Sequence, residues 1–226
     1  MAEVCLVDLV ALSALPEDAE LGACLGVEER ARLQHMRAPQ RRRQFLAGHW
    51  LARQLTCERF GGEPADWCWH TENSGKPRLL CAGRVVEIAV THSAEYIACA
   101  VAAEPIGLDL EIRQRERDWR ALARHALSEV EALTIAALPP VEHGTAFIER
   151  WALHEAWGKR AGEGVLLSRM RRRRFIESEP QTSELRSWSL PEGSLALAVS
   201  AEAIVECRGI EPASAPGFWR CLQSQG

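Results

Sequence analysis

The sequence has no long apolar run and no strong excess of one charge. None of its apolar stretches reaches the roughly 20 residues that a membrane-crossing helix needs. The first twenty residues, MAEVCLVDLVALSALPEDAE, lack a basic start and carry early acidic residues, so we expect no signal peptide. The formal net charge of −4 supplies no general basic field for nucleic acid. We therefore expect a cytoplasmic protein without a membrane or nucleic-acid partner.

Paired cysteines are also missing, because none of the eight cysteines forms a C-x-x-C pair. A zinc site of the usual spacing is therefore not expected, and a disulfide framework would require secretion. We expect reduced, mostly buried thiols. The cysteines are Cys5, Cys24, Cys57, Cys68, Cys81, Cys99, Cys207 and Cys221.

What is present is an ordinary globular composition, 226 residues with 47% hydrophobic side chains, enough for one large domain or two small ones. Apolar periodicity predicts helices over 27–37, 41–55 and 144–161, and a fourth helix that opens at Ser128 and stops before Pro139. Alternation predicts strands over 86–90, 96–101 and 106–111, and two more over 194–199 and 203–207. Residues 61–83 are rich in turn formers.

A faint repeat links two distant segments. Residues 92–97 read His-Ser-Ala-Glu-Tyr-Ile and residues 199–204 read Val-Ser-Ala-Glu-Ala-Ile, and each lies between two predicted strands. The repeat indicates two similar α+β halves, although six residues can also match by chance.

The strand 106–111 carries two carboxylates on one side. Side chains alternate along a strand, so Asp109 and Glu111 point the same way, and Gly107 is expected to leave open space beside them. Neighbouring carboxylates repel each other unless a cation lies between them, and Mg²⁺ prefers such oxygen ligands. The alternative is a strand end that emerges into solvent.

A second acidic position lies on the predicted helix 144–161. Trp151, Glu155 and Lys159 follow an i, i+4, i+8 spacing and share one stripe of that helix. The apolar flanks favour a functional site over a solvated Glu–Lys pair.

Together these residues resemble the surfactin-type 4′-phosphopantetheinyl transferases. The family's G-x-D-x-E strand is matched by residues 107–111, and its W-x-x-K-E-x-x-x-K helix by residues 151–159. Further matching segments, in the family's order, are Arg43-Gln44-Phe45-Leu46-Ala47-Gly48, Gly75-Lys76-Pro77, Val90-Thr91-His92-Ser93, Leu127-Ser128-Glu129 and Gly162-Glu163-Gly164-Val165.

The resemblance implies an α+β fold of two pseudo-symmetric subdomains, each a small antiparallel sheet packed with helices. We expect an N-terminal subdomain over 1–104, a C-terminal one over 105–226, and an active site between the halves of a monomeric single-chain pseudo-dimer. The implied reaction moves 4′-phosphopantetheine from coenzyme A to a serine of an apo acyl or peptidyl carrier protein. Adenosine 3′,5′-bisphosphate is the other product, and the carrier could serve fatty-acid, polyketide or non-ribosomal peptide synthesis.

The same resemblance implies residue roles. Asp109, Glu111 and Glu155 would hold Mg²⁺, with Asp109, Glu155 and Lys159 as the catalytic set. Glu155 would take the serine proton, directly or through a metal-bound water. Coenzyme A would be bound by Arg32, Arg43, Lys76, Pro77, His92 and Lys159, and one of the two arginines would meet its 3′-phosphate.

His154 departs from the family, which usually has lysine at this position. The change could weaken phosphate binding, make activity more pH-dependent, or have no effect if the position faces solvent. It also motivates one rival hypothesis, a catalytically impaired paralogue. We predict that His154→Lys leaves or raises activity.

A run of arginines covers 169–174, interrupted by Met170. It is either a solvated edge or a docking patch for acidic carrier proteins. A basic nucleic-acid-binding module that uses both arginine clusters is a second rival, disfavoured by the net charge.

Overall fold

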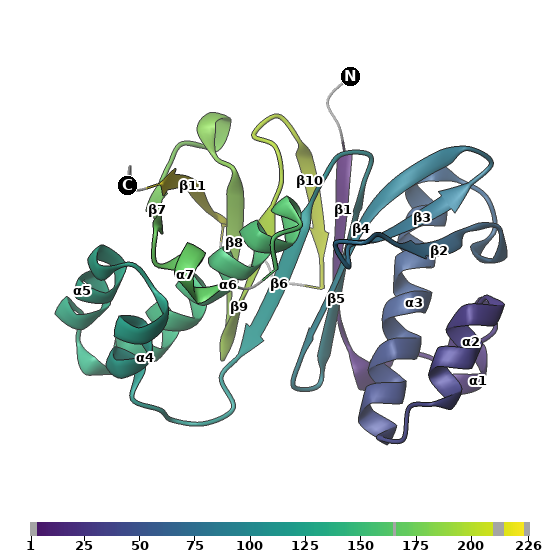
Figure 1. Ribbon diagram of the computed structural model, residues 1–226, viewed down its shortest axis with the longest axis horizontal. Coiled ribbons are helices and arrows are strands. Elements are labelled where there is room, and N and C mark those ends of the chain that lie inside the picture. The colour runs from purple at the N-terminus through teal and green to yellow at the C-terminus, as the bar shows by residue number, and fades with distance from the viewer. Residues whose placement is uncertain (1–3, 165, 210–214, 224–226) are drawn as a thin grey trace. The chain divides into compact units, whose positions relative to one another are not determined.

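One long helix lies across each of two β-sheets in the computed structural model (Figure 1). The structure describes residues 4–164, 166–209 and 215–223, so Val165 of the predicted 162–165 segment lies outside the described residues. The chain divides into a first unit of residues 1–106 and 203–209 and a second unit of residues 107–202 and 210–226.

The first unit is built on a six-stranded sheet in the order β10-β1-β5-β4-β3-β2. All neighbours pair antiparallel except β1 and β10, which are parallel. The strands are β1 (Val4–Ala11), β2 (Cys68–Thr71), β3 (Pro77–Cys81), β4 (Arg84–Ser93), β5 (Tyr96–Ala102) and β10 (Ile204–Arg208). The helices are α1 (Asp18–Leu21), α2 (Val27–Gln34) and α3 (Pro39–Phe60).

Helix α3 packs on this sheet and encloses the core of the first unit. Its buried side chains lie around most of the helix, so that α1 and α2 can cover the side turned away from the sheet. The core it shares with the sheet includes Leu46, Leu51, Leu55, Ile88, Ile97 and Val101.

The second unit carries a five-stranded antiparallel sheet in the order β6-β9-β8-β11-β7. Its strands are β6 (Gly107–Ile112), β7 (Arg173–Glu177), β8 (Leu185–Leu190), β9 (Gly193–Ala198) and β11 (Gly217–Gln223). Its helices are α4 (Trp119–Ala126), α5 (Glu129–Ala137), α6 (His143–Ala161) and α7 (Leu167–Met170).

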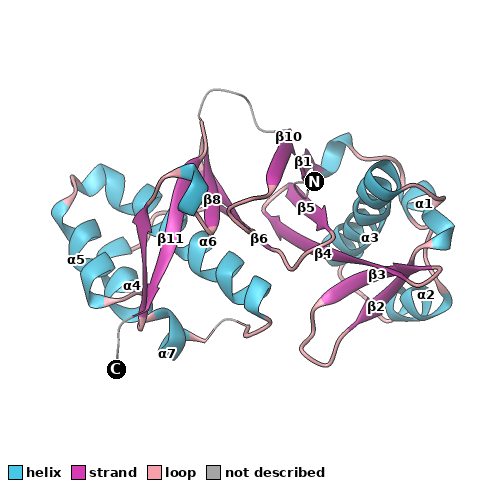
Figure 2. Ribbon diagram, turned by 90° about the horizontal axis from the view of Figure 1, so that it is seen from above, coloured by secondary structure: helices cyan, strands magenta, loops and turns pink. Residues whose placement is uncertain are grey.

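Helix α6 is apolar on two sides because it lies between the sheet and a helical layer (Figure 2). Ala152, Leu153 and Ala156 pack on the sheet, whereas Phe147 and Ile148 pack on α4 and α5. The helix stops before Gly162, whose left-handed conformation (φ 67°) suits a residue without a Cβ.

The predicted α+β class, with one sheet and its helices in each unit, is confirmed. Two features differ from the sequence-based expectation. Residues 203–209 belong with the first unit, because β10 pairs with β1, whereas the division predicted at residue 104 assigns them to the second half. Strands β2 and β3 lie inside 61–83, which the sequence described only as turns, because short strands at a sheet edge leave little periodic signal.

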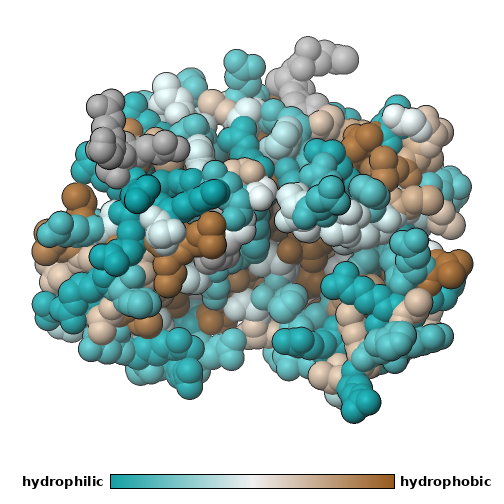
Figure 3. All heavy atoms as spheres, in the orientation of Figure 1, coloured by the Kyte–Doolittle hydropathy of each residue, from teal (hydrophilic) through white to brown (hydrophobic). Residues whose placement is uncertain are grey.

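None of the helices in the described part of the chain has the length and hydrophobicity that a membrane crossing requires. On the face drawn in Figure 3, hydrophobic residues reach the surface as separate patches among hydrophilic ones.

Candidate active site

Strand β6 and helix α6 touch at backbone level at Gly107. A Cβ on this residue would lie 2.0 Å from the carbonyl oxygen of Ala156 and 2.4 Å from the backbone nitrogen of Arg160. Glycine is required because any side chain would push the helix away from the strand. The prediction of open space beside Gly107 is therefore wrong, since the α6 backbone fills it. The close approach brings the acidic residues of β6 to those of α6.

Lys159 joins the two elements through its ammonium group. Nζ donates to Oδ1 of Asp109 at 2.6 Å and to the carbonyl oxygen of Leu108 at 3.1 Å, and it lies 3.9 Å from Oε2 of Glu155. Asp109 is only 3% exposed, so its negative charge needs a close cation. In this structure the lysine itself supplies that cation.

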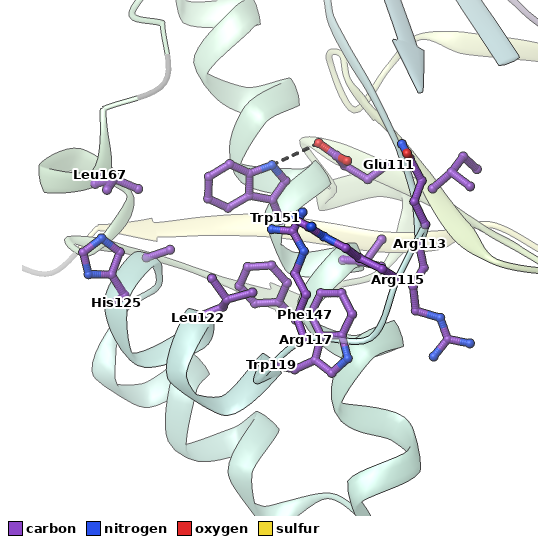
Figure 4. Close-up of a pocket in the computed structure, with 14 residues that line it drawn as sticks. Glu111, Arg113, Arg115, Arg117, Trp119, Leu122, His125, Phe147, Trp151 and Leu167 are labelled. Carbon is purple, nitrogen blue, oxygen red and sulfur yellow. Dashed lines mark hydrogen bonds between the residues drawn. The ribbon is translucent and has the colours of Figure 1, made fainter. Parts of the chain in front are cut away.

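Glu111 lies at the outer end of the same strand face. The indole Nε1 of Trp151 donates to Oε1 of Glu111 at 3.2 Å, which the dashed line in Figure 4 marks. Trp151 is the first residue of the predicted 151–159 stripe. It therefore fixes a carboxylate of β6 from one turn before Glu155 along the helix.

The carboxylates of this cluster influence one another electrostatically. Burial raises the pKa of Glu111 to about 7, and the nearby charges of Asp109 and Glu155 contribute. Burial, followed by the charge of Asp109, raises the pKa of Glu155 to about 7, while Lys159 and Trp151 oppose the shift. Such a shift is typical of functional sites, where like charges are held together.

The donor set suits a hard cation, since Asp109, Glu111 and Glu155 offer only carboxylate oxygens. Their mutual repulsion is what a divalent ion would relieve. Within the described residues, no group of three His, Cys, Asp or Glu side chains is already arranged as a metal-binding cluster. The chemistry of the residues thus fits Mg²⁺, whereas their side-chain arrangement places Lys159 on Asp109.

A cavity of about 660 Å³ opens next to Glu111. Its apolar part comes from α4 and α6 and includes Trp119, Leu122, Phe147 and Trp151. Its basic part comes from arginines in the segment after β6, which Figure 4 shows beside the aromatic residues of the cavity. The arginines concerned are Arg113, Arg115 and Arg117. Sequence reasoning missed them, although arginine at every second position directly after an acidic strand is a visible pattern.

His154 lies in the interior and not in the carboxylate cluster. It is 3% exposed, and Nε2 is 3.0 Å from Oε2 of Glu131 on α5. Its ring also meets Phe175 edge-on, with 4.7 Å between ring centroids. The alternative in which this position faces solvent is therefore wrong, because neighbouring helix residues point in different directions and His154 is directed to Glu131 while Glu155 lies with the carboxylate cluster.

The predicted arginines of the first unit have different surroundings. Arg43 donates to the carbonyl oxygens of Leu12, Leu15 and Pro16 and pairs with Asp18 at 2.8 Å, so it clamps the chain before α1. Arg32 is exposed on α2, with its guanidinium 5.6 Å from the ring centroid of Phe45. Of the two, Arg32 has the guanidinium more accessible to a phosphate.

Three further predicted coenzyme A ligands also lie in the first unit. Lys76 and Pro77 stand where the turn after β2 enters β3, and Nζ of Lys76 pairs with Oε2 of Glu87 at 2.8 Å. His92 is exposed near the end of β4. Their role toward a ligand stays a prediction, as do the roles of Arg32 and Arg43.

Comparison with known proteins places a recognised segment over this site. The family model described as the 4′-phosphopantetheinyl transferase superfamily matches residues 105–201. That range contains β6 and α6 and so includes all four residues of the carboxylate–lysine cluster.

Two relatives of known activity are similar over a longer stretch. The 4′-phosphopantetheinyl transferase HetI of Nostoc sp. is 30% identical over 151 residues, which are 65% of this chain and 63% of that protein. A 4′-phosphopantetheinyl transferase of Bacillus subtilis is 28% identical over 156 residues, 69% of this chain and 68% of that protein. The chain thus spans about two thirds of the length of these relatives.

A solved structure also shows a partial likeness. A holo-(acyl-carrier-protein) synthase from Bacillus anthracis, crystallised in complex with CoA (3′,5′-ADP), is 20% identical. The match covers 45% of this chain and 96% of that one, with a TM-score of 0.40.

Proposed function

We propose that the chain belongs to the 4′-phosphopantetheinyl transferase superfamily, whose model matches residues 105–201, and that it transfers 4′-phosphopantetheine from coenzyme A to a serine of an apo carrier protein. The observation that carries this proposal is the partly buried cluster of Asp109, Glu111, Glu155 and Lys159 inside the matched segment. Action as a cytoplasmic monomer on acyl or peptidyl carriers is part of the same proposal.

Glu155 accepts the proton of the attacking serine hydroxyl. Its pKa of about 7 leaves a substantial fraction of the carboxylate ionised at neutral pH, and keeps it basic enough to take a proton. The serine oxygen forms a bond to phosphorus. The bond from that phosphorus to the bridging oxygen breaks, and adenosine 3′,5′-bisphosphate leaves. Such a transfer depends on positioning and on neutralising charge.

Lys159 neutralises charge on the pyrophosphate, for which a compact ammonium on a flexible stem is suited. Its present partners, Asp109 and the carbonyl oxygen of Leu108, hold it at the contact of β6 and α6. Asp109, Glu111 and Glu155 are the residues that would hold Mg²⁺. When bound, the ion would place further positive charge beside the pyrophosphate.

The cavity beside Glu111 has room for part of the transferred group. Its aromatic floor of Trp119, Phe147 and Trp151 suits the methyl and methylene groups of the pantetheine arm. Arg115 and Arg117 suit neighbouring phosphate oxygens, whereas Arg113 is paired with Glu192 at 2.9 Å.

Neither rival hypothesis, the impaired paralogue or the nucleic-acid-binding module, is favoured by these observations. An impaired paralogue was suggested only by His154, which is an interior partner of Glu131 and does not enter the carboxylate cluster. A nucleic-acid-binding module has no support in the net charge or in the similarity to transferases.

The test is mass spectrometry of several apo carrier proteins incubated with coenzyme A, with and without Mg²⁺. Addition of phosphopantetheine to at least one carrier is expected, and Glu155→Gln should lower the rate at least about 100-fold while it keeps the fold. Glu142→Gln, which changes an exposed glutamate just before α6, is the matched control and should leave the rate unchanged. Undiminished turnover by Glu155→Gln would exclude the assigned role.

A further inference from the structure

A second cavity of the second unit lies between the beginning of α5 and strand β7. It measures about 400 Å³, and four consecutive arginines line it. We call it the arginine groove, which comprises Ser128, Glu129, Val130, Arg171, Arg172, Arg173, Arg174 and Leu222.

The groove is positive in a chain whose net charge is −4. Arg171, Arg172 and Arg174 are exposed, and Glu129 is the one acidic residue among the lining residues. Arg173 pairs with Glu163, so its charge is largely balanced. The arginines of the groove outnumber its one acidic lining residue, so its local charge is opposite in sign to that of the protein as a whole.

Apolar surface accompanies this charge. Val130 is 49% exposed on α5, and Leu222 contributes a half-buried side chain from β11. A free phosphate would have no use for these apolar neighbours. A protein surface that combines acidic and apolar side chains would contact both kinds of group.

The walls of the groove are tied to the helix that carries Glu155. Oε1 of Glu131 accepts the backbone N–H of Phe175 in β7 at 3.0 Å. Oε2 accepts the hydroxyl of Ser128 at 2.9 Å and lies 3.0 Å from Nε2 of His154 in α6. Because this network is buried, α5, β7 and α6 keep a fixed arrangement. A partner held in the groove therefore has a defined position relative to Glu155.

From this geometry we propose that the arginine groove binds an acidic, partly apolar surface of the carrier protein. This inference rests on the proposed function. The arginines attract the carrier and orient it, while the chemistry takes place at the carboxylate cluster. Contacts of this kind change the apparent affinity for the carrier and its salt dependence, and they leave the bond-breaking step untouched.

The experiment compares two triple variants of the full chain with equal change in charge. The groove variant is Arg171→Ala/Arg172→Ala/Arg174→Ala. The control is Arg30→Ala/Arg37→Ala/Arg120→Ala, which removes three exposed arginines elsewhere. Thermal unfolding establishes that both are folded, and steady-state kinetics gives kcat and the KM values for carrier and coenzyme A at low and high salt.

The groove variant should raise the KM for the carrier about tenfold at low salt, with a smaller increase at high salt. Its kcat and its KM for coenzyme A should stay unchanged, and the control should change each value less than about twofold. An unchanged carrier KM, an equal rise in the control, or a rise in the coenzyme A KM instead would overturn the proposal.

Two further measurements separate this proposal from its alternatives. Calorimetric titration with apo carrier in the absence of coenzyme A measures docking separately from the transfer reaction. A carrier that binds in the groove but is not modified would count against the proposed function and not against the docking site. Titration with a labelled DNA duplex tests a nucleic-acid surface. Binding of DNA that depends on the groove, together with carrier binding that does not, would also overturn the proposal.

Discussion

At the scale of single residues, the position of Glu111 depends on one indole N–H. Trp151→Phe keeps an aromatic ring in the cavity floor but removes the 3.2 Å hydrogen bond. Loss of a hydrogen bond that orients a ligand residue typically costs 10–100-fold, so we expect kcat to fall at least about tenfold. Carrier-transfer kinetics measures this at several Mg²⁺ concentrations.

The control for that change is Trp157→Phe on the same helix, where the indole packs near Phe175. It should leave the rate within about twofold. Equal losses for the two variants would mean that Trp151 acts only as packing.

His154 shows how a residue inside a motif can be structural. His154→Ala would leave the Glu131 carboxylate buried without its imidazole partner. Breaking a buried pair in this way costs about 3–5 kcal/mol of unfolding free energy, which urea unfolding would measure. His154→Lys places an ammonium group beside the Glu131 carboxylate, so we expect activity to be kept or raised. Unchanged stability of His154→Ala would show that the pair contributes little.

At the scale of elements, a buried ionic cluster joins α2 to α3. Glu29 bonds Arg53 at 2.7 Å and also contacts His49, whose ring stacks on Trp69 at 3.7 Å between centroids. Burial acts against the ionised form of Glu29, but the hydrogen bonds from His49 and Arg53 prevail and lower its pKa to about 2. Burial also lowers the pKa of His49, against the pull of Glu29.

Both shifts make the first unit sensitive to acid. Below pH 6.5 the unfolded chain protonates its histidine before the folded protein does, so stability falls as the pH drops through that value. The contribution of Glu29 is complete above pH 4.5 and is lost as the pH approaches 2. Urea unfolding across this range should show both losses. His49→Gln introduces a side chain that cannot titrate, so it should remove the loss of stability near pH 6.5. If the variant keeps the same dependence of unfolding free energy on pH near 6.5, that loss does not come from His49.

At the scale of the whole molecule, the chain returns to its first unit after building most of the second. Strand β10 pairs with β1 over Val4–Asp8 and Ile204–Arg208 and covers the edge that β1 would otherwise present. An uncovered edge strand invites pairing with other chains. We expect a fragment of residues 1–106 to self-associate, and addition of a 203–209 peptide to reduce this. Light scattering measures the effect, and a fragment that is monomeric without the peptide would contradict it.

Local signals were sufficient for the two longest helices and for several of the other elements. The helices predicted over 41–55 and 144–161 form over 39–60 and 143–161, and the capped helix begins after Ser128 as expected. The strands predicted over 194–199 and 203–207 form over 193–198 and 204–208. Periodicity and capping work here because they reflect each segment's own burial and its own unpaired backbone groups. The elements that were not predicted are helices α1, α4 and α7 and strands β1, β2, β3, β7, β8 and β11.

The sequence by itself determined the chemistry that is available: a strand with Asp109 and Glu111, and a helix with Glu155 and Lys159 on one stripe. Only the tertiary structure decided how these groups are used. In the folded chain the α6 backbone packs against Gly107, Trp151 donates a hydrogen bond to Glu111, and the buried His154 contacts Glu131. Strand β10 pairs with β1 and so belongs to the sheet of the first unit. The reason is physical: residue spacing fixes which face of an element a side chain occupies, but the partner of that face depends on packing between segments distant in the chain.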